Sequence, residues 1–219
     1  MVNLPATAQN LQTDTWIKAT WEEFLALEND PSWAEGKFYY DQGYLRIETS
    51  PLGFAHSRDS SIISTAIILF AALKNLRIVE LTNASFRKAG AQECQPDTAF
   101  YIGADFSLPP RNNEPVNLDE FDPPTLVIET AASSLNDDLG RKRLLYERLA
   151  VQEYWVVNVN TEEVIAFSIA NGRSGQVQES EVLPGLSISL IEEALKRSQT
   201  EDDGAITRWL LETFKGASI

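Results

Sequence analysis

The apolar run at residues 125–131, TLVIETA, places the tightest constraint on how this chain can fold. Its length and its leucine, valine and isoleucine side chains are typical of a buried β-strand. One carboxylate, Glu129, interrupts the run. An ionised carboxylate on a buried strand is costly unless it is paired or binds a metal ion. The residues alone leave two interpretations open: a glutamate near the strand end that reaches solvent or an arginine, or a glutamate held in a site.

The segments around this run alternate between helical and strand patterns. Thr20 and Glu23 form a capping box that predicts a short helix through Leu27, and residues 37–48 predict a hairpin around Asp41–Gly43. Longer helices are expected over residues 57–76 and from about 136 to 150, with helices near the C-terminus over 190–198 and 204–215. Further strands are expected at residues 77–82, 84–88, 96–102, 153–158, 164–169 and 177–182, with a long loop over 103–124. This order favours an α/β fold with a mixed sheet flanked by helices.

Composition excludes several kinds of site. The 219 residues include one cysteine, Cys94, and one histidine, His56. A disulfide framework is therefore impossible, and neither a cysteine-based zinc site nor a multi-histidine metal site can form. Cys94 is expected to be a small apolar residue rather than a nucleophile. A small-molecule hydrolase is the least favoured of three hypotheses for the function, because no G-x-S-x-G nucleophile elbow is present.

The charge balance bears on partners and location. Lysine and arginine total 18 against 32 aspartate and glutamate residues, a net charge of −14, which argues against a passive nucleic-acid coat protein. One basic cluster, Arg141, Lys142, Arg143 and Arg148, leaves a local nucleic-acid site possible. No apolar run is long enough to cross a membrane, and residues 1–10 lack the features of a secretory signal. We therefore expect a soluble cytoplasmic protein without a membrane partner.

Three further residues are candidates for a site, each with a simpler interpretation. Asp97 follows Pro96 at the start of a predicted strand, where aspartate commonly serves a turn or a helix cap. Lys142 lies on a charged helix face, where a solvated position and a surface ion pair with Asp138 are the simplest expectations. His56, at the start of the long helix, is expected to bond the local backbone.

Together these residues fit one kind of chemistry. Two carboxylates on neighbouring strands can hold one Mg²⁺ ion that keeps open water positions. The metal ion polarises the scissile phosphate and lowers the pKa of bound water, while a nearby lysine offsets charge that develops on the phosphoryl oxygens. The combination of Asp97, Glu129 and Lys142 therefore indicates metal-assisted phosphodiester hydrolysis.

Several segments resemble the Uma family, which is classed among endonucleases of the PD-(D/E)xK superfamily and is numerous in cyanobacteria. Residues 95–101, QPDTAFY, resemble the family's PD strand, and residues 126–134, LVIETAASS, resemble its strand that ends in glutamate and a serine-containing turn. Residues 138–146, DLGRKRLLY, and 151–157, VQEYWVV, resemble its D-x(3)-K-x(3)-Y helix and V-x-E-Y-W strand. Residues 51–56, PLGFAH, fit its loop from proline to histidine. The resemblance covers about residues 18–190.

The resemblance implies roles for individual residues. Asp97 and Glu129 would be ligands of Mg²⁺ or Mn²⁺, and Lys142 would be the catalytic lysine, reaching back from the helix. His56 would point toward the cleft, and Tyr146 would be a further site residue.

Two positions depart from the pattern that the resemblance implies. The superfamily's lysine usually stands two residues after the glutamate, where this chain has Ala131. Many relatives carry a glutamate where this chain has Tyr39 in the first hairpin. The alternative hypothesis is therefore a catalytically degenerate nuclease fold that acts as a non-catalytic interaction module.

The resulting expectations for organisation and partners are specific. Residues 1–17 should form a flexible N-terminus, residues 18–190 the nuclease-like domain, and residues 191–219 helices that pack on that domain or in a dimer interface. The partner would be DNA, and the protein would be a homodimer because two single sites related by a two-fold axis can cut both strands. Ile206, Trp209, Leu210 and Phe214 are the apolar positions offered for such an interface or for capping the sheet.

Overall fold

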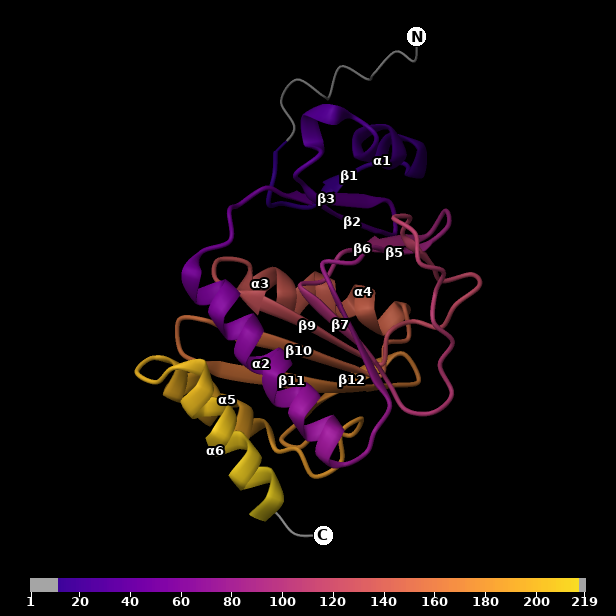
Figure 1. The fold of residues 1–219 in the computed structure, drawn as a ribbon. Coiled ribbons are helices and arrows are strands. Elements are labelled where there is room, and N and C mark those ends of the chain that lie inside the picture. The colour runs from indigo at the N-terminus through magenta and orange to yellow at the C-terminus, as the bar shows by residue number, and fades with distance from the viewer. Residues whose placement is uncertain (1–11, 217–219) are drawn as a thin grey trace. The chain divides into compact units, whose positions relative to one another are not determined.

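The computed structural model describes residues 12–216, so residues 1–11 of the predicted flexible N-terminus lie outside the described part. The described chain divides into two units, each built from segments that are discontinuous in sequence (Figure 1). The first unit comprises residues 12–51, 85–95 and 109–121, and the second comprises residues 52–84, 96–108 and 122–216. The predicted α/β class is confirmed, but each unit contains its own mixed sheet, whereas a single mixed sheet was expected.

The first unit is a small sheet covered by one helix. Its strands are β1 (Ile17–Lys18), β2 (Lys37–Asp41), β3 (Tyr44–Glu48), β5 (Phe86–Lys88), β6 (Gln92–Cys94) and β8 (Val116–Asn117), in the order β1-β3-β2-β6-β5-β8. Only the β5–β8 pair is parallel. Helix α1 (Trp21–Glu28) and the short 3₁₀ helix η2 (Pro31–Trp33) complete the unit. Apolar side chains of α1, β2 and β3 form its core.

Two local predictions in the first unit are confirmed. Thr20 accepts a hydrogen bond from the Glu23 N–H, and the Glu23 side chain accepts one from the Thr20 N–H, which is the predicted capping box. The hairpin turns at Gln42 and Gly43, whose φ angles of +49° and +79° are those of a tight turn that suits glycine. Residue Ile17 of the predicted flexible N-terminus lies in β1 and pairs with β3.

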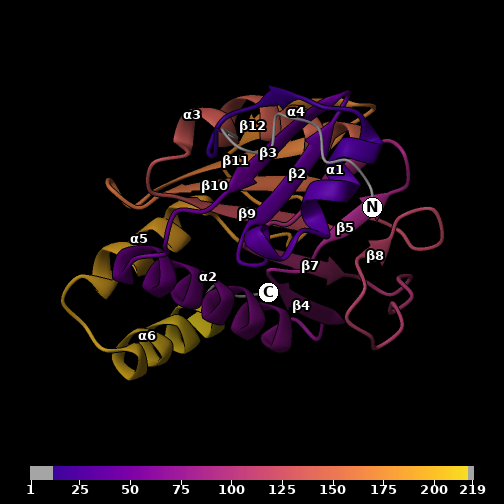
Figure 2. The same ribbon diagram turned by 90° about the horizontal axis from the view of Figure 1, so that it is seen from above.

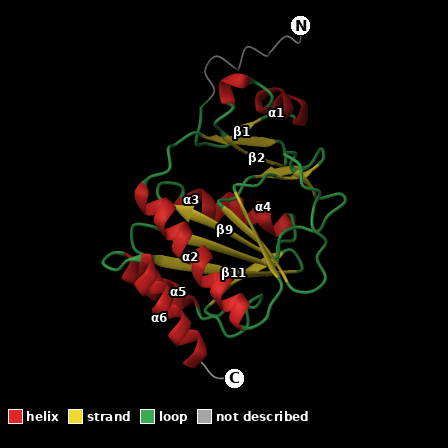
Figure 3. Ribbon diagram, in the orientation of Figure 1, coloured by secondary structure: helices red, strands yellow, loops and turns green. Residues whose placement is uncertain are grey.

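The second unit is a six-stranded sheet between two layers of helices (Figure 3). Its strands are β4 (Ile78–Thr82), β7 (Thr98–Ile102), β9 (Leu126–Ala131), β10 (Glu153–Asn158), β11 (Glu163–Ala170) and β12 (Arg173–Val177), in the order β12-β11-β10-β9-β7-β4. Only β9 and β10 run parallel, because a helical crossover joins them. That crossover consists of α3 (Leu135–Asp137), the π-helical segment η3 (Asp138–Lys142) and α4 (Arg143–Arg148).

The two helical layers of the second unit lie on opposite faces of its sheet, as Figure 2 shows from above. Helices α2 (Phe54–Leu73), α5 (Ile188–Ser198) and α6 (Asp203–Gly216) cover one face, and their apolar side chains form a core with Ile128 and Trp155 of the sheet. The α3–η3–α4 crossover covers the other face. Ile206, Leu210 and Phe214 are buried in the core, so the C-terminal helices use these residues to cover the sheet.

Several elements differ from the sequence-based expectations. The predicted strand 177–182 is wrong: a two-residue turn at Asn171 and Gly172, both with positive φ, starts β12 already at Arg173. Strand β6 was not predicted, because its three residues are too few to show a periodic pattern. The segment from 135 to 148 is not one regular α-helix but passes through the π-helical turn. Within the described residues, no helix is both long and apolar enough to cross a membrane.

Candidate active site

Glu129 points toward the crossover helices of the second unit. Side chains alternate between the two faces of a strand, and the neighbours Ile128 and Thr130 face α2: Ile128 lies in the α2 core, and the Thr130 hydroxyl lies 3.0 Å from that of Ser60. Glu129 therefore points to the opposite face, where the Tyr146 hydroxyl of α4 donates to its Oε1 at 2.6 Å. Only 2 % of Glu129 is exposed, so the interpretation of a glutamate that reaches solvent is wrong.

Lys142 joins Glu129 on this face. Its Nζ lies 3.6 Å from Glu129 Oε1 and 2.9 Å from Asp138 Oδ1. Lys142 and Asp138 are each about 1 % exposed, so the expectation of a solvated lysine with a surface ion pair is wrong in its location, although the pair itself exists. Both residues belong to the π-helical segment, a rare backbone form that often occurs at functional sites. The Ser134 hydroxyl donates to the other Asp138 oxygen at 2.5 Å.

Asp97 is placed by the pairing of β7 with β9. Thr98 pairs with Ile128 in an antiparallel register, so Asp97, one residue earlier, comes next to the Glu129 position. Its Oδ2 accepts a hydrogen bond from the Thr130 N–H at 2.8 Å. The two predicted carboxylates therefore lie on either side of one peptide bond. Glu129 precedes this bond, and Asp97 accepts the hydrogen bond of its N–H, which belongs to Thr130.

His56 is directed at Asp97 rather than at the local backbone. Its Nε2 lies 3.0 Å from Asp97 Oδ2, and the residue is 8 % exposed. The backbone-bonding interpretation is thus wrong, and His56 enters the site from the first turn of α2. Its Nδ1 is buried and has no hydrogen-bond partner among the described residues.

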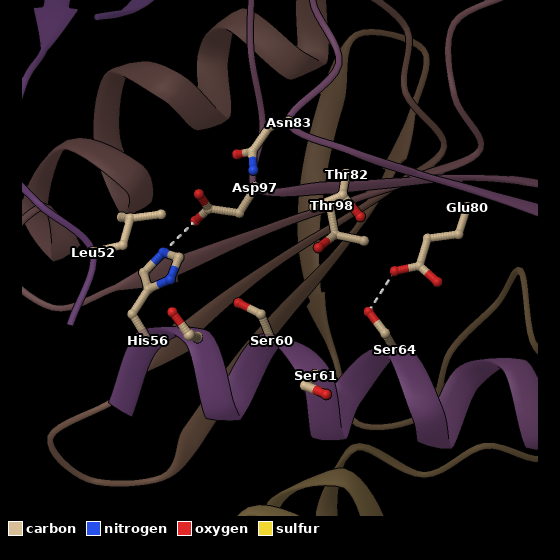
Figure 4. Close-up of a pocket in the computed structure, with 11 residues that line it drawn as sticks. Leu52, His56, Ser60, Ser61, Ser64, Glu80, Thr82, Asn83, Asp97 and Thr98 are labelled. Carbon is tan, nitrogen blue, oxygen red and sulfur yellow. Dashed lines mark hydrogen bonds and ion pairs between the residues drawn. The ribbon is translucent and has the colours of Figure 1, made fainter. Parts of the chain in front are cut away.

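A cavity of about 330 Å³ opens beside this histidine–aspartate pair (Figure 4). Its walls come from the first half of α2 and from the ends of β4 and β7 that adjoin Asp97. Serine and threonine are the most frequent residues of the lining, which consists of Leu52, His56, Ser57, Ser60, Ser61, Ser64, Glu80, Thr82, Asn83, Asp97 and Thr98. Ser64 donates to Glu80 at 2.6 Å across the cavity.

One more carboxylate lies close to His56. Asp59 follows it by three residues on α2, is buried, and has an Oδ2 without a hydrogen-bond partner among the described residues. Burial and, to a smaller extent, the charge of Glu162 raise the pKa of Asp59 from 3.8 to about 6, against the opposing effects of His56 and Arg58.

The structure thus divides the predicted site residues into two groups. Glu129, Lys142 and Tyr146 meet on the crossover side, whereas Asp97 and His56 meet on the α2 side. Sequence reasoning did not include Asp138 in the site, although the four-residue spacing to Lys142 was the signal that could have placed it there. Ala131, where the superfamily's lysine usually stands, is buried in β9 two residues after Glu129 and so shares its face.

Comparison with known proteins identifies the family to which this chain is similar. Residues 21–203 match the Uma2 family, described as "Putative restriction endonuclease". A crystal structure of a "putative nuclease" from Anabaena variabilis ATCC 29413 matches with a TM-score of 0.55 and 17 % identity, covering 80 % of this chain and 98 % of that chain. At this identity the likeness shows the fold alone. No curated protein matches the chain.

Proposed function

Because the chain belongs to the Uma2 family of restriction-endonuclease-like proteins, we propose that it is a metal-dependent endonuclease that hydrolyses DNA phosphodiester bonds. The observation that carries the proposal is the buried lysine: Lys142 Nζ lies 3.6 Å from Glu129 Oε1, at the position that the family resemblance implies for the catalytic lysine. A lysine held among buried carboxylates of neighbouring elements is an arrangement that occurs in many active sites.

Stability alone is a weak reason for such a cluster. Moving charged groups out of water is costly, and well-packed apolar side chains of similar volume often stabilise a fold as well or better. Glu129, Asp138 and Lys142 are nevertheless all almost fully buried. Their burial therefore supports a chemical role for the cluster.

The chemistry of the donor set fits a hard divalent cation. Mg²⁺ prefers oxygen ligands, keeps several waters, and is commonly bound through only one or two protein carboxylates. Among the described residues there is no group of three or more histidine, cysteine, aspartate or glutamate side chains arranged to hold a metal ion. We propose that the ion would be held by Asp97, on the α2 side, and Glu129, on the crossover side, across the Glu129–Thr130 peptide between them, with the remaining positions taken by water and phosphate oxygens. Mg²⁺ or Mn²⁺ would supply Lewis-acid polarisation of the phosphate and a more acidic water.

The protein's own residues orient these groups. The Tyr146 hydroxyl fixes Glu129 Oε1, while the Thr130 N–H and His56 Nε2 fix Asp97 Oδ2. Asp138, itself held by Ser134, pairs with the Lys142 ammonium at 2.9 Å and holds it beside Glu129. The role we assign to Lys142 is to stabilise negative charge that develops on the phosphoryl oxygens and to orient the attacking water.

A second candidate function is a non-catalytic interaction module that retains the fold. The observation in its favour is Tyr39, which stands where the resemblance implies a glutamate. It is fully buried in the first unit, and its hydroxyl donates to the Gln95 carbonyl at 2.8 Å. Lys142 also lies nearer to Asp138 than to Glu129, as a purely structural ion pair would.

Metal binding separates the two candidates without relying on activity. Isothermal titration of the full chain with Mn²⁺ should show one site that Asp97→Asn and Glu129→Gln each weaken strongly, because a neutral amide is a poorer ligand than a carboxylate. Glu212→Gln is the matched control, since Glu212 is exposed on α6. Binding that is equal in all four proteins, or absent from the wild type, would contradict the proposed metal site.

A further inference from the structure

The cavity beside Asp97 has a composition that the hydrolytic site does not explain. Its lining is rich in hydroxyl groups and includes the amide side chain of Asn83 and the carboxylate of Glu80. Among the described residues that line it there is no lysine or arginine. The cavity also presents apolar surface, so such walls suit a group that combines apolar faces with several hydrogen-bond donors and acceptors and carries little charge of its own. The sugar and base of a nucleotide have this chemistry, whereas a bare phosphate does not.

His56 supplies an independent sign that a ligand belongs here. It lines the cavity, is more than nine-tenths buried, and uses Nε2 for Asp97 (Figure 4). Its Nδ1 remains buried without a hydrogen-bond partner among the described residues. A buried polar atom is normally satisfied, so this nitrogen calls for a partner that arrives from outside the chain.

An exposed aromatic residue stands at the same end of α2. Phe54 is the first residue of the helix and is 82 % exposed. Positions three and seven residues later on a helix share a face, so Phe54 shares a face with Ser57 and Ser61 of the cavity wall. Leu52, also exposed, lines the cavity itself. An aromatic ring and an aliphatic side chain beside a hydroxyl-lined cavity form a surface on which a flat base can stack.

The start of α2 can also accommodate the phosphate that adjoins such a base. The N-cap residue, Gly53, provides no side-chain cap, so no side chain of the N-cap competes for the N–H groups of the first turn. These groups and the helix dipole favour an anion at this end of a twenty-residue helix. The N–H groups of this helix end do not form a site alone, but they supplement the cavity, His56 and Phe54.

From this combination we infer that the cavity is a subsite for an unpaired nucleotide, so that the preferred substrate is single-stranded or locally unpaired DNA. The inference rests on the proposed function, because it assigns a substrate class to the same site. In a duplex both faces of each base are covered by its neighbours, so Phe54 can stack only on a base that has left the helix. A net charge of −14 points the same way, since the chain has few cations for contacts along a duplex backbone.

Binding measured without cleavage tests this inference. Fluorescence anisotropy of the full chain with a short labelled single strand, and with a duplex of the same sequence, is recorded in Ca²⁺ in place of Mg²⁺. The single strand should bind more tightly than the duplex. Phe54→Ala should weaken single-strand binding by at least about fivefold, the lower end of what loss of one base–aromatic stack costs, and Phe54→Trp should retain it. Phe54 is exposed, so its removal leaves the core intact.

Leu73→Ala is the matched control. Leu73 is an exposed apolar residue at the other end of the same helix, about 28 Å from Phe54 along the helix axis. It should bind both DNAs like the wild type. Duplex binding as tight as single-strand binding, or equal affinities for Phe54→Ala and Leu73→Ala, would overturn the inference.

A parallel Mg²⁺ cleavage assay separates this inference from the proposed function. Single-strand binding that depends on Phe54, without any metal-dependent cleavage, would support the subsite and refute the endonuclease. Duplex cleavage that Phe54→Ala leaves unchanged would support the endonuclease and refute the subsite.

Discussion

Replacing Lys142 with methionine tests whether the buried cluster is charged as described. Methionine keeps most of the stem volume but removes the ammonium, so Glu129 and Asp138 would face each other without their shared cation. Removing one partner of a buried ion pair typically costs about 3–5 kcal/mol, because an uncompensated charge stays buried. We expect Lys142→Met to lose about that much unfolding free energy. For a chain of this size, such a loss corresponds to a decrease in Tm of roughly 6–20 °C.

Urea unfolding followed by circular dichroism measures the effect, and a second variant assigns it. Adding Asp138→Asn to Lys142→Met removes one of the two uncompensated carboxylates and should recover at least about 1 kcal/mol, a coupling typical of residues in contact. Lys196→Met, on an exposed position of α5, is the control and should stay within about 0.5 kcal/mol of the wild type. If Lys142→Met is as stable as that control, the lysine is not held as a buried charge and the reasoning fails.

Three further outcomes are expected. Tyr146→Phe removes the hydroxyl that donates to Glu129 at 2.6 Å, and it should lower the unfolding free energy by about 1–3 kcal/mol in the same urea assay; an unchanged midpoint would contradict this. Burial raises the pKa of Glu93 from 4.5 to about 8, although Arg87 partly offsets the shift, so its contribution to stability is full below pH 4.5 and is lost as the pH rises through 8. Glu93→Gln should remove this part of the pH dependence, which urea midpoints on either side of that range would detect. A homodimer is also expected, and light scattering that gives the monomer mass at micromolar concentration would count against it.

Local signals in the sequence predicted most of the elements. The capping box at Thr20, the hairpin at residues 37–48 and the apolar run that became β9 appear where their residue types indicate. Strand β12 was displaced because two adjacent positive-φ residues close the turn earlier than the composition of residues 171–175 indicates. The division into two sheets could not be predicted, because pairing between distant segments leaves no local pattern.

The candidate site was predicted by residue type but not by environment. Lys142 lies among Arg141 and Arg143, and that pattern predicts a solvated face. The π-helical turn changes which residues of the segment face the sheet, and Lys142 is buried beside Glu129. His56 was expected to bond the local backbone, because nothing in the neighbouring sequence indicates that Asp97, just before β7, lies with its Oδ2 3.0 Å from His56 Nε2. Both errors have one cause, because tertiary contacts decide the burial of Lys142 and the hydrogen-bond partner of His56.

The most direct test of the central claim is cleavage of DNA by the purified chain in Mg²⁺, measured beside Glu129→Gln. Plasmid and single-stranded DNA are incubated with each protein in Mg²⁺, in Mn²⁺ and in EDTA, after circular dichroism has shown that both proteins are folded. The account predicts cleavage by the wild type only when a divalent ion is present, and a rate at least about a hundredfold lower for Glu129→Gln, because a ligand of the metal is lost. Absence of cleavage by the folded wild type under all these conditions, or equal rates for the two proteins, would contradict it.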